Sequence, residues 1–305
     1  MNKYAVTVIA SVVIWGTTIP PTKWALETIP PFTLSFLRLF LASLVLLPYA
    51  WKKSKKVKKV PYPWPRLWSL SFTGVGGFLM LGYYGIELTS GLHVSILSAT
   101  MPIFTILLGV FYLKERMRRS EIISSFLGIC GVLVIAIQPN ITKESSLFGD
   151  VLILLSCFVW AVYIVQLKRP QGEGQLTKEW FTAITLFLGS IMIIPLAFME
   201  IWTGGLPVIS WKAWGCIAYL SLFPTIAAYW LWNKGVEHIS IARASAYLNA
   251  IPIIEIICCV LLLNETVTWR LLLGGSLVLI GVIIIEKNAT KKILVSKDRE
   301  QEYIS

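Results

Sequence analysis

The chain has 305 residues, of which 56% are hydrophobic and 14% are charged, and its net charge is +11. An ordinary globular domain carries roughly 25% charged residues, so this composition argues against a soluble protein. The basic residues lie between apolar blocks and no aromatic-basic recognition motif accompanies them, which excludes nucleic-acid binding as the reason for the charge.

The apolar residues form ten blocks, each close to the roughly 20 residues that one membrane-spanning helix requires. The blocks are 4–24, 32–50, 67–88, 93–112, 121–138, 149–167, 179–200, 212–233, 243–263 and 269–286. We therefore expect an all-α membrane protein with ten transmembrane helices.

The first block follows a single lysine and could be either a signal peptide or a spanning helix. The apolar run continues through Trp15 and Gly16 without a small-residue cleavage site, so we expect a spanning helix. Trp15 lies deep in this block, and it is a candidate to line a substrate cavity.

The second and third blocks contribute two more candidates. Arg38 is a strong base inside a predicted span, where its guanidinium could hold the carboxylate or phosphate of a substrate. It could instead form an ion pair in the bundle or extend to the interface. Tyr83 belongs to a set of deep aromatic residues that could line a cavity.

The sixth and eighth blocks extend this aromatic set. Trp160 and Tyr163 lie in the sixth block, and Trp232 and Asn233 lie in the eighth. Aromatic walls suit apolar or amphipathic solutes and cations, so we expect these residues to contact a small-molecule substrate.

The ninth block carries an acid at its centre, Glu255, which costs roughly 2.5–3.5 kcal/mol to place there on insertion scales. It should face the bundle interior, either as a proton-coupling or cation-binding carboxylate, or as a structural acid that is protonated or paired with Arg38. Asn249 lies three residues before Pro252 and so shares a helix face with carbonyls that the proline cannot engage. Tyr247, in the same block, is a further candidate to line the cavity.

The loops differ strongly in charge. Most of the 27 lysines and arginines fall on the side that also holds both chain ends, and the densest run is at 52–59. The positive-inside rule then predicts cytoplasmic N- and C-termini, and we expect the protein in the plasma (inner) membrane of a bacterium. The run at 52–59 could also contact anionic lipids or a partner, although a topology signal is the simpler interpretation.

The chain contains an internal repeat. At an offset of 150 residues, Pro102 aligns with Pro252 and Glu115 with Glu265, and at an offset of 145 Trp15 aligns with Trp160. Two halves, 1–140 and 141–288, would each hold five helices, followed by a cytoplasmic tail at 289–305. An odd number of helices places the copies in opposite orientations, as in the inverted repeats of secondary transporters that work by alternating access. The two prolines are candidate hinges.

Three motifs resemble a known family. Trp15-Gly16 is followed by Lys23, the segment 98–102 ending in Pro102 leads to Leu113-Lys114-Glu115, and the segment 247–252 ending in Pro252 leads to Leu263-Asn264-Glu265. These motifs resemble EamA-type members of the drug/metabolite transporter superfamily. The resemblance implies a ten-helix transporter, often an exporter of amino acids or other small metabolites.

Two other classes stay open as alternatives. An intramembrane lipid-modifying enzyme would require a catalytic cluster, but no HExxH, GxSxG, paired-aspartate or P-loop motif is present, so we expect no enzymatic activity. A channel would require a filter or subunit symmetry that the sequence does not indicate.

The five cysteines lie in apolar blocks without metal-ligand spacing, so we expect neither a metal site nor a cofactor. The expected partners are a small-molecule substrate, membrane lipids and, if Glu255 is coupling, a proton; the protein is expected to be a monomer or homodimer.

Overall fold

The computed structural model describes residues 3–54, 64–113, 119–136, 146–168, 177–236, 250–281 and 283–284, and within them every regular element is a helix. The elements are α1 (Lys3–Gly16), α2 (Ile19–Leu26), α3 (Pro31–Ser54), α4 (Trp64–Ser71), η1 (Phe72–Gly76), α5 (Gly77–Leu88), α6 (Gly91–Ser98), α7 (Met101–Leu113), α8 (Arg119–Ala136), α9 (Leu147–Lys168), α10 (Lys178–Gly204), α11 (Trp211–Leu220), η2 (Ser221–Ala227), α12 (Ala228–Val236), α14 (Ala250–Leu263) and an apolar helix at Trp269–Gly281.

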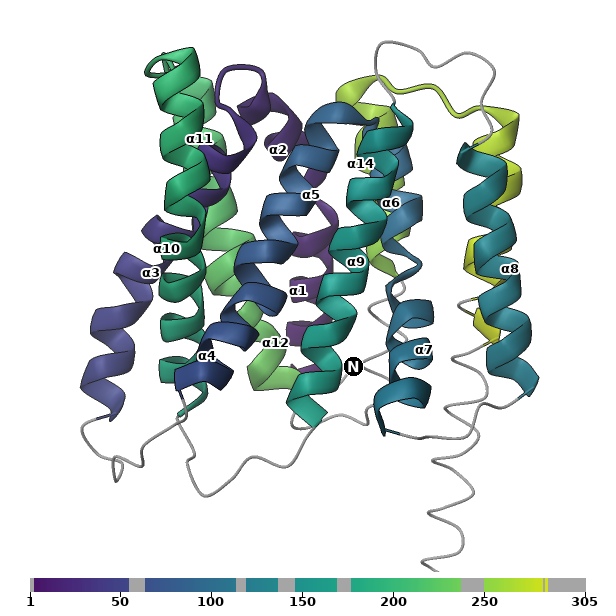
Figure 1. Cartoon of the computed structure of the whole chain (residues 1–305), viewed down its shortest axis with the longest axis horizontal. Helices are drawn as coiled ribbons and strands as arrows, with labels where there is room; N and C mark the ends of the chain where they lie inside the picture. Colours follow the sequence, from purple (N-terminus) through teal and green to yellow (C-terminus); the bar gives the residue numbers. More distant parts are fainter. Residues whose placement is uncertain are drawn as a thin grey trace, which may run out of the picture.

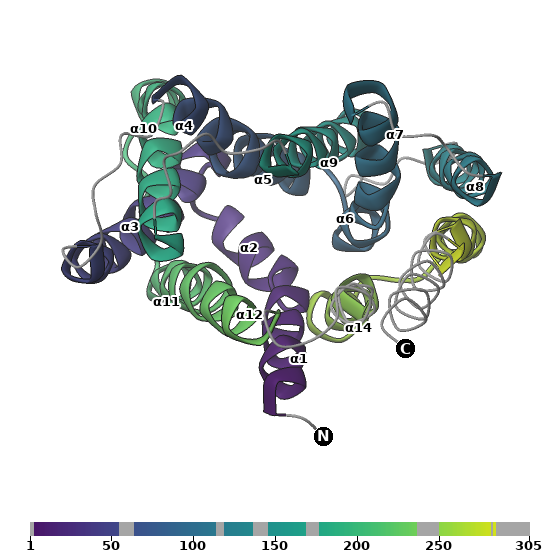
Figure 2. The ribbon, with the colours of Figure 1, turned by 90° about the horizontal axis from the view of Figure 1, so that it is seen from below.

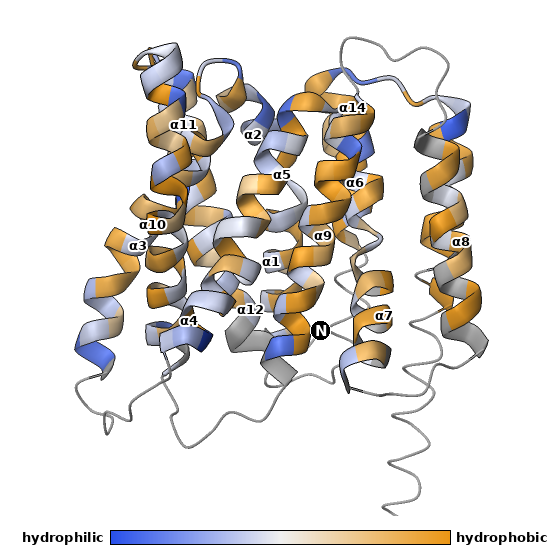
Figure 3. Ribbon diagram, in the orientation of Figure 1, coloured by the Kyte–Doolittle hydropathy of each residue, from blue (hydrophilic) through white to orange (hydrophobic). Residues whose placement is uncertain are grey.

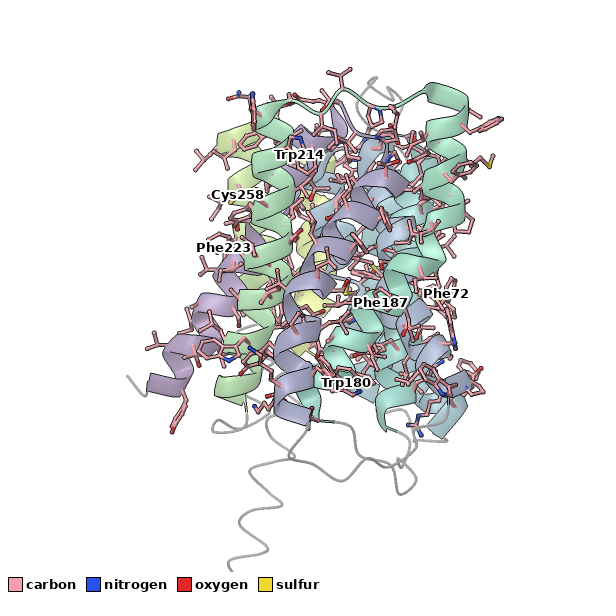
Figure 4. The ribbon with its side chains drawn as sticks, turned by 90° about the vertical axis from the view of Figure 1, so that its left-hand side faces the viewer. Phe72, Trp180, Phe187, Trp214, Phe223 and Cys258 are labelled. Atoms are coloured by element: carbon pink, nitrogen blue, oxygen red, sulfur yellow. The ribbon has the colours of Figure 1, made fainter. Side chains whose placement is uncertain are left out.

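The helices lie side by side in one bundle, with hydrophobic residues along their middles and hydrophilic residues towards their ends (Figures 1 and 3). Large apolar side chains cover the outside, as expected where lipid is the solvent. Trp214 lies near the upper end of the bundle and Trp180 near the lower end (Figure 4), the levels at which tryptophans anchor a protein in the membrane interface.

Six segments of the described chain are long and apolar enough to cross a membrane. They are Tyr4–Leu26, Pro31–Lys53, Gly91–Gly109, Leu147–Gln166, Glu179–Gly204 and Trp211–Trp232, while Ala250–Leu263 and Trp269–Gly281 are shorter apolar helices. The chain is therefore a multi-pass, all-helical membrane protein in the part described. The expected count of ten crossings stays a prediction.

Several of these segments are interrupted rather than continuous. Between α1 and α2, the hydroxyl of Thr18 donates to the carbonyl oxygen of Trp15 at 2.7 Å, and two prolines follow in the first turn of α2. Proline is well tolerated there because its missing N–H would have no partner in the helix. Between α6 and α7, the hydroxyl of Thr100 donates to the carbonyl oxygen of Leu97 at 2.6 Å, two residues before Pro102. The chain therefore breaks at two places within the bundle.

Two π-helical segments occur at related places. η1 spans Phe72–Gly76 and η2 spans Ser221–Ala227, so they are separated by about the 150-residue offset of the sequence repeat. A π-turn widens the helix locally and is often found at functional sites. α1 packs against η2 and α12, and α9 packs in the equivalent way against η1 and α5.

Helices at matching places in the two predicted halves run in opposite directions. In Figure 1, α1 runs upwards and α9 downwards, and α3 runs downwards beside the upward α10. Seen from below, α2 projects into the middle of the bundle (Figure 2), where it packs against α5, α11 and α14. The break before α2 therefore lies close to the interior, where a solute site would have to be built.

Candidate functional site

Arg38 lies inside the bundle. It is the eighth residue of α3, so seven residues at 1.5 Å each place it about 10 Å along the helix from its start. Its side chain is 9% exposed. The face of α3 that carries Arg38 also carries buried Leu34 and Ala42, one turn away on each side, so the packing of an apolar stripe turns the guanidinium inward.

Two hydroxyl groups hold the guanidinium. Nε donates to Oγ1 of Thr225 in η2 at 2.9 Å, and an Nη atom donates to the hydroxyl of Tyr83 in α5. The guanidinium carbon also lies 5.7 Å from the centre of the Tyr83 ring. We call Arg38, Tyr83 and Thr225 the Arg38 network; it joins three helices that are far apart in sequence.

The π-turn places Thr225 for this role. Its hydroxyl donates to the carbonyl oxygen of Leu220, five residues back, at 2.8 Å, in the wide register of η2. The hydroxyl of Ser221 in the same turn donates to the main-chain carbonyl of Arg38 at 3.1 Å. Sequence reasoning missed Thr225, although its position directly after Pro224 inside an apolar block was a usable signal, because proline frees a carbonyl and disturbs the helix there.

Three aromatic residues lie beside η2. The indole N–H of Trp15 donates to the carbonyl oxygen of Pro224 at 2.9 Å, and its ring centre lies 5.4 Å from that of Tyr229 and 5.5 Å from that of Trp232. We call Trp15, Tyr229 and Trp232 the aromatic group. The structure therefore brings four of the expected site residues, Trp15, Arg38, Tyr83 and Trp232, to one region around η2.

Two more of the expected aromatics form a separate group around η1. Trp160 and Tyr163 of α9 have ring centres 5.2 Å apart, and Trp160 lies 5.0 Å from Phe78. Gly74 of η1 packs so closely that an added Cβ would lie 2.5 Å from the Tyr163 ring, so only glycine fits there. Trp160 and Tyr163 therefore lie beside η1 in the way that the aromatic group lies beside η2.

Glu255 is buried, and one of its carboxyl oxygens has no hydrogen-bond partner among the described residues. It lies in α14 at 7% exposure, and among the residues described no group lies within hydrogen-bonding distance of its Oε2 atom. α14 packs against α1 and α6, and an added Cβ on Gly16 would lie 2.6 Å from Ile254. A carboxyl in such a position is costly as an unpaired anion, and its default interpretation is a functional site.

Arg38 and Glu255 do not pair. No described acid lies within ion-pair distance of the guanidinium. Five other acids of the described chain have partners elsewhere: Glu27 contacts Lys212, Glu179 contacts Lys53, Asp150 contacts His93, Glu200 caps α3 and Glu265 caps α6. The Arg38-paired alternative for Glu255 therefore has no support from the geometry.

The remaining expected residues are described only in part. Tyr247 and Asn249 lie outside the described residues. Pro102 is the second residue of α7, Asn233 lies in α12, and Pro252 is the third residue of α14. Among the described residues, no group of three histidine, cysteine, aspartate or glutamate side chains is placed to hold a metal ion.

Known proteins resemble this chain along almost its whole length. The model of the EamA-like transporter family matches residues 2–137 and again 147–286. An uncharacterized transporter of Archaeoglobus fulgidus is 28% identical over 280 residues, covering 90% of this chain and 94% of its own. The uncharacterized transporter YetK of Bacillus subtilis is 27% identical over 294 residues, covering 92% of this chain and 85% of its own. A solved crystal structure of a protein superimposes with a TM-score of 0.63 over 95% of this chain and 99% of that one at 16% identity, which shows a shared fold.

Proposed function

Because this chain belongs to the EamA-like transporter family, we propose that it is a secondary transporter that exports amino acids or other small metabolites by alternating access. A secondary transporter requires a solute site inside the membrane that opens to each side in turn. The Arg38 network and the aromatic group supply polar and apolar contacts at such a place, beside an interrupted helix. The solute is a small molecule, and the protein acts as a monomer or homodimer.

The proposed architecture is ten transmembrane helices in two inverted halves, residues 1–140 and 141–288, followed by a tail at 289–305. Three observations support it: the family model matches twice, the two π-turns are separated by the offset of the repeat, and related helices run in opposite directions in Figure 1. Rocking one half against the other, with Pro102 and Pro252 as hinges, would expose the same site alternately.

Proton coupling is the proposed energy source. The observation that carries it is Glu255, a buried carboxyl without a hydrogen-bond partner in the described chain. A group in this position can exist stably as a neutral acid when the bundle is closed, and it can release its proton when water reaches it. Its protonation would thereby be tied to the opening of the bundle.

Flux in proteoliposomes with and without an imposed pH gradient tests this proposal. A gradient should drive substrate accumulation by the wild type, and Glu255→Gln should abolish that response while passive exchange continues. Glu27→Gln is the matched control, because Glu27 is an exposed acid paired with Lys212 and the same change there should leave the response intact. Gradient-independent flux in the wild type, together with a silent Glu255→Gln, would contradict proton coupling.

The same preparations separate the alternatives. Turnover of a lipid by protein that moves no metabolite would favour a lipid-modifying enzyme, and flux that does not saturate with solute would favour a channel. Loading the solute inside the vesicles and then outside them distinguishes export from import.

A further inference from the structure

The guanidinium of Arg38 carries a charge that no described side chain neutralises. A guanidinium has five N–H donors, and its hydrogen bonds to Thr225 and Tyr83 use Nε and one Nη atom. Both acceptors are neutral hydroxyls. Because no described carboxylate lies within ion-pair distance, a full positive charge lies about 10 Å along a membrane helix, on a side chain 9% exposed, without a counter-ion from the described chain. Such a charge is costly unless something else binds to it.

The network orients the unused donors. Thr225 fixes one edge of the guanidinium and Tyr83 fixes another, and the Tyr83 ring at 5.7 Å restricts the tilt of its plane. The Thr225 hydroxyl already donates to the carbonyl oxygen of Leu220, whereas the Tyr83 hydroxyl accepts from arginine and keeps its own hydrogen to donate. A planar fork of N–H groups with a phenol hydroxyl beside it matches two oxygens of a carboxylate.

We propose that Arg38 binds the carboxylate group of the transported molecule, so that the substrate itself is the missing counter-ion. This inference rests on the proposed transport function and names the substrate class. One guanidinium matches the single charge of a carboxylate, whereas a phosphate dianion would require a second cation. Two of the described lysines near the bundle ends have other contacts: Lys23 donates to the carbonyl oxygen of Thr89, and Lys212 pairs with Glu27.

The neighbouring aromatic group defines the rest of the solute. Trp15 is bonded to the π-turn at Pro224, one residue from Thr225, so the indole and the guanidinium are tied to the same segment of η2. The ring centre of Trp15 lies 5.4 Å from that of Tyr229 and 5.5 Å from that of Trp232, and the three rings offer an apolar surface. The substrate class is therefore small monocarboxylates with an apolar or aromatic side group, amino acids included.

A series of probes that differ only in the head group tests the proposal. We would measure thermal stabilisation of the purified full-length protein by phenylacetate, phenylalanine, phenylacetamide, phenethylamine and phenyl phosphate, and then counterflow of each compound in proteoliposomes. The two carboxylates should stabilise the wild type and be exchanged, whereas the neutral amide and the amine should not. A preference for phenyl phosphate, phenylacetamide or phenethylamine would overturn the proposal.

Variants assign the effect to Arg38. Arg38→Gln should weaken phenylacetate binding about 10- to 100-fold, because charge-assisted hydrogen bonds to the carboxylate are lost. Arg38→Lys keeps the charge but loses the fork, and Tyr83→Phe loses the flanking hydroxyl, so each should weaken binding by a smaller factor. The matched control Lys212→Gln removes a positive charge at the exposed pair with Glu27 and should bind as the wild type does.

The outcomes separate this inference from transport itself. Exchange of neutral or cationic probes that is unchanged in Arg38→Gln would overturn the carboxylate assignment and leave the transport proposal standing. No exchange of any compound by folded wild-type protein would contradict transport. If Arg38→Gln is unstable, unchanged phenylacetate affinity in both Arg38→Lys and Tyr83→Phe would overturn the assignment.

Discussion

At the scale of single residues, the role of a buried polar group depends on the partner that it contacts. Arg38, His93 and Glu255 are all less than 10% exposed, yet Arg38 bonds to neutral hydroxyls, His93 bonds to Asp150, and Glu255 bonds to no described group. Burial of a charge is costly unless a partner compensates it. The histidine is therefore structural by its contacts, and the other two groups are the ones available to a solute or a proton.

The pair of His93 and Asp150 gives a stability prediction. Both side chains are buried, the ring Nδ1 lies 3.1 Å from the carboxylate, and the hydroxyl of Thr89 donates to the same carboxylate at 2.5 Å. Asp150→Ala leaves both partners unsatisfied and should destabilise the protein by about 1–3 kcal/mol. Asp150→Asn can still accept from Thr89 and should cost less. Equal melting temperatures of the wild type and Asp150→Ala in detergent would contradict this assignment.

At the scale of elements, helix ends are held by acids from other helices. The Glu200 carboxylate of α10 accepts from the N–H groups of Phe32 and Thr33 at 3.0 and 2.7 Å, at the start of α3. Glu265 accepts in the same way from Gly91 and Leu92 at the start of α6, at 2.7 and 2.8 Å. The N-terminal turn of a helix has unsatisfied donors and a partial positive charge, so both contacts are favourable. They join α3 to α10 and α6 to the segment after α14.

Removal of one such contact gives a prediction for the α3–α10 pair. Glu200→Ala should destabilise the protein by about 1–2 kcal/mol, as the loss of a helix cap does, and Glu200→Gln should retain part of that contribution. The melting temperatures of both Glu200 variants can be measured by thermal unfolding, with the exposure of cysteine thiols as the signal. As a control, Glu179→Ala removes an acid of the same helix that pairs with the exposed Lys53, and it should have a smaller effect. The reverse order of the two losses would refute the capping role.

At the scale of the whole molecule, the positions of the basic residues predict which end of the bundle faces the cytoplasm. The start of α1 and the ends of α3 and α9 lie at the same, lower end of the bundle in Figure 1, while α10 ends at the upper one. The basic residues Lys52 and Lys53 lie at the end of α3. The positive-inside rule therefore favours a cytoplasmic lower end.

Single cysteines test this orientation. In a background without the five native cysteines, Thr203→Cys at the end of α10 should react with a membrane-impermeant maleimide added to whole cells. Lys53→Cys at the end of α3 should react only after the cells are opened. Both sites are exposed, so lack of access to the residue itself would not protect them. Labelling of Lys53→Cys in intact cells would reverse the proposed topology.

The sequence by itself determined the class of the protein and the location of most helices. Solvent preference is a local property of each segment, so long apolar blocks predicted spans that the structure shows at Pro31–Lys53 and Leu147–Gln166, among others. The motifs around Trp15, Pro102 and Pro252 are also local in sequence, and their spacing indicated the family to which the chain belongs. Local breaks were less visible, because the π-turns depend on packing against α1 and α9.

Only the tertiary structure decided which candidates act together. Arg38 is bonded to residues 45 and 187 positions away, so its partners depend on how three helices rotate and pack. Glu255 was an acid that could have paired with Arg38 by composition alone, and the geometry separates the two. The sequence thus determined that polar groups must face inward, because lipid cannot solvate them, and the packing of distant helices decided which of them are left to bind a solute.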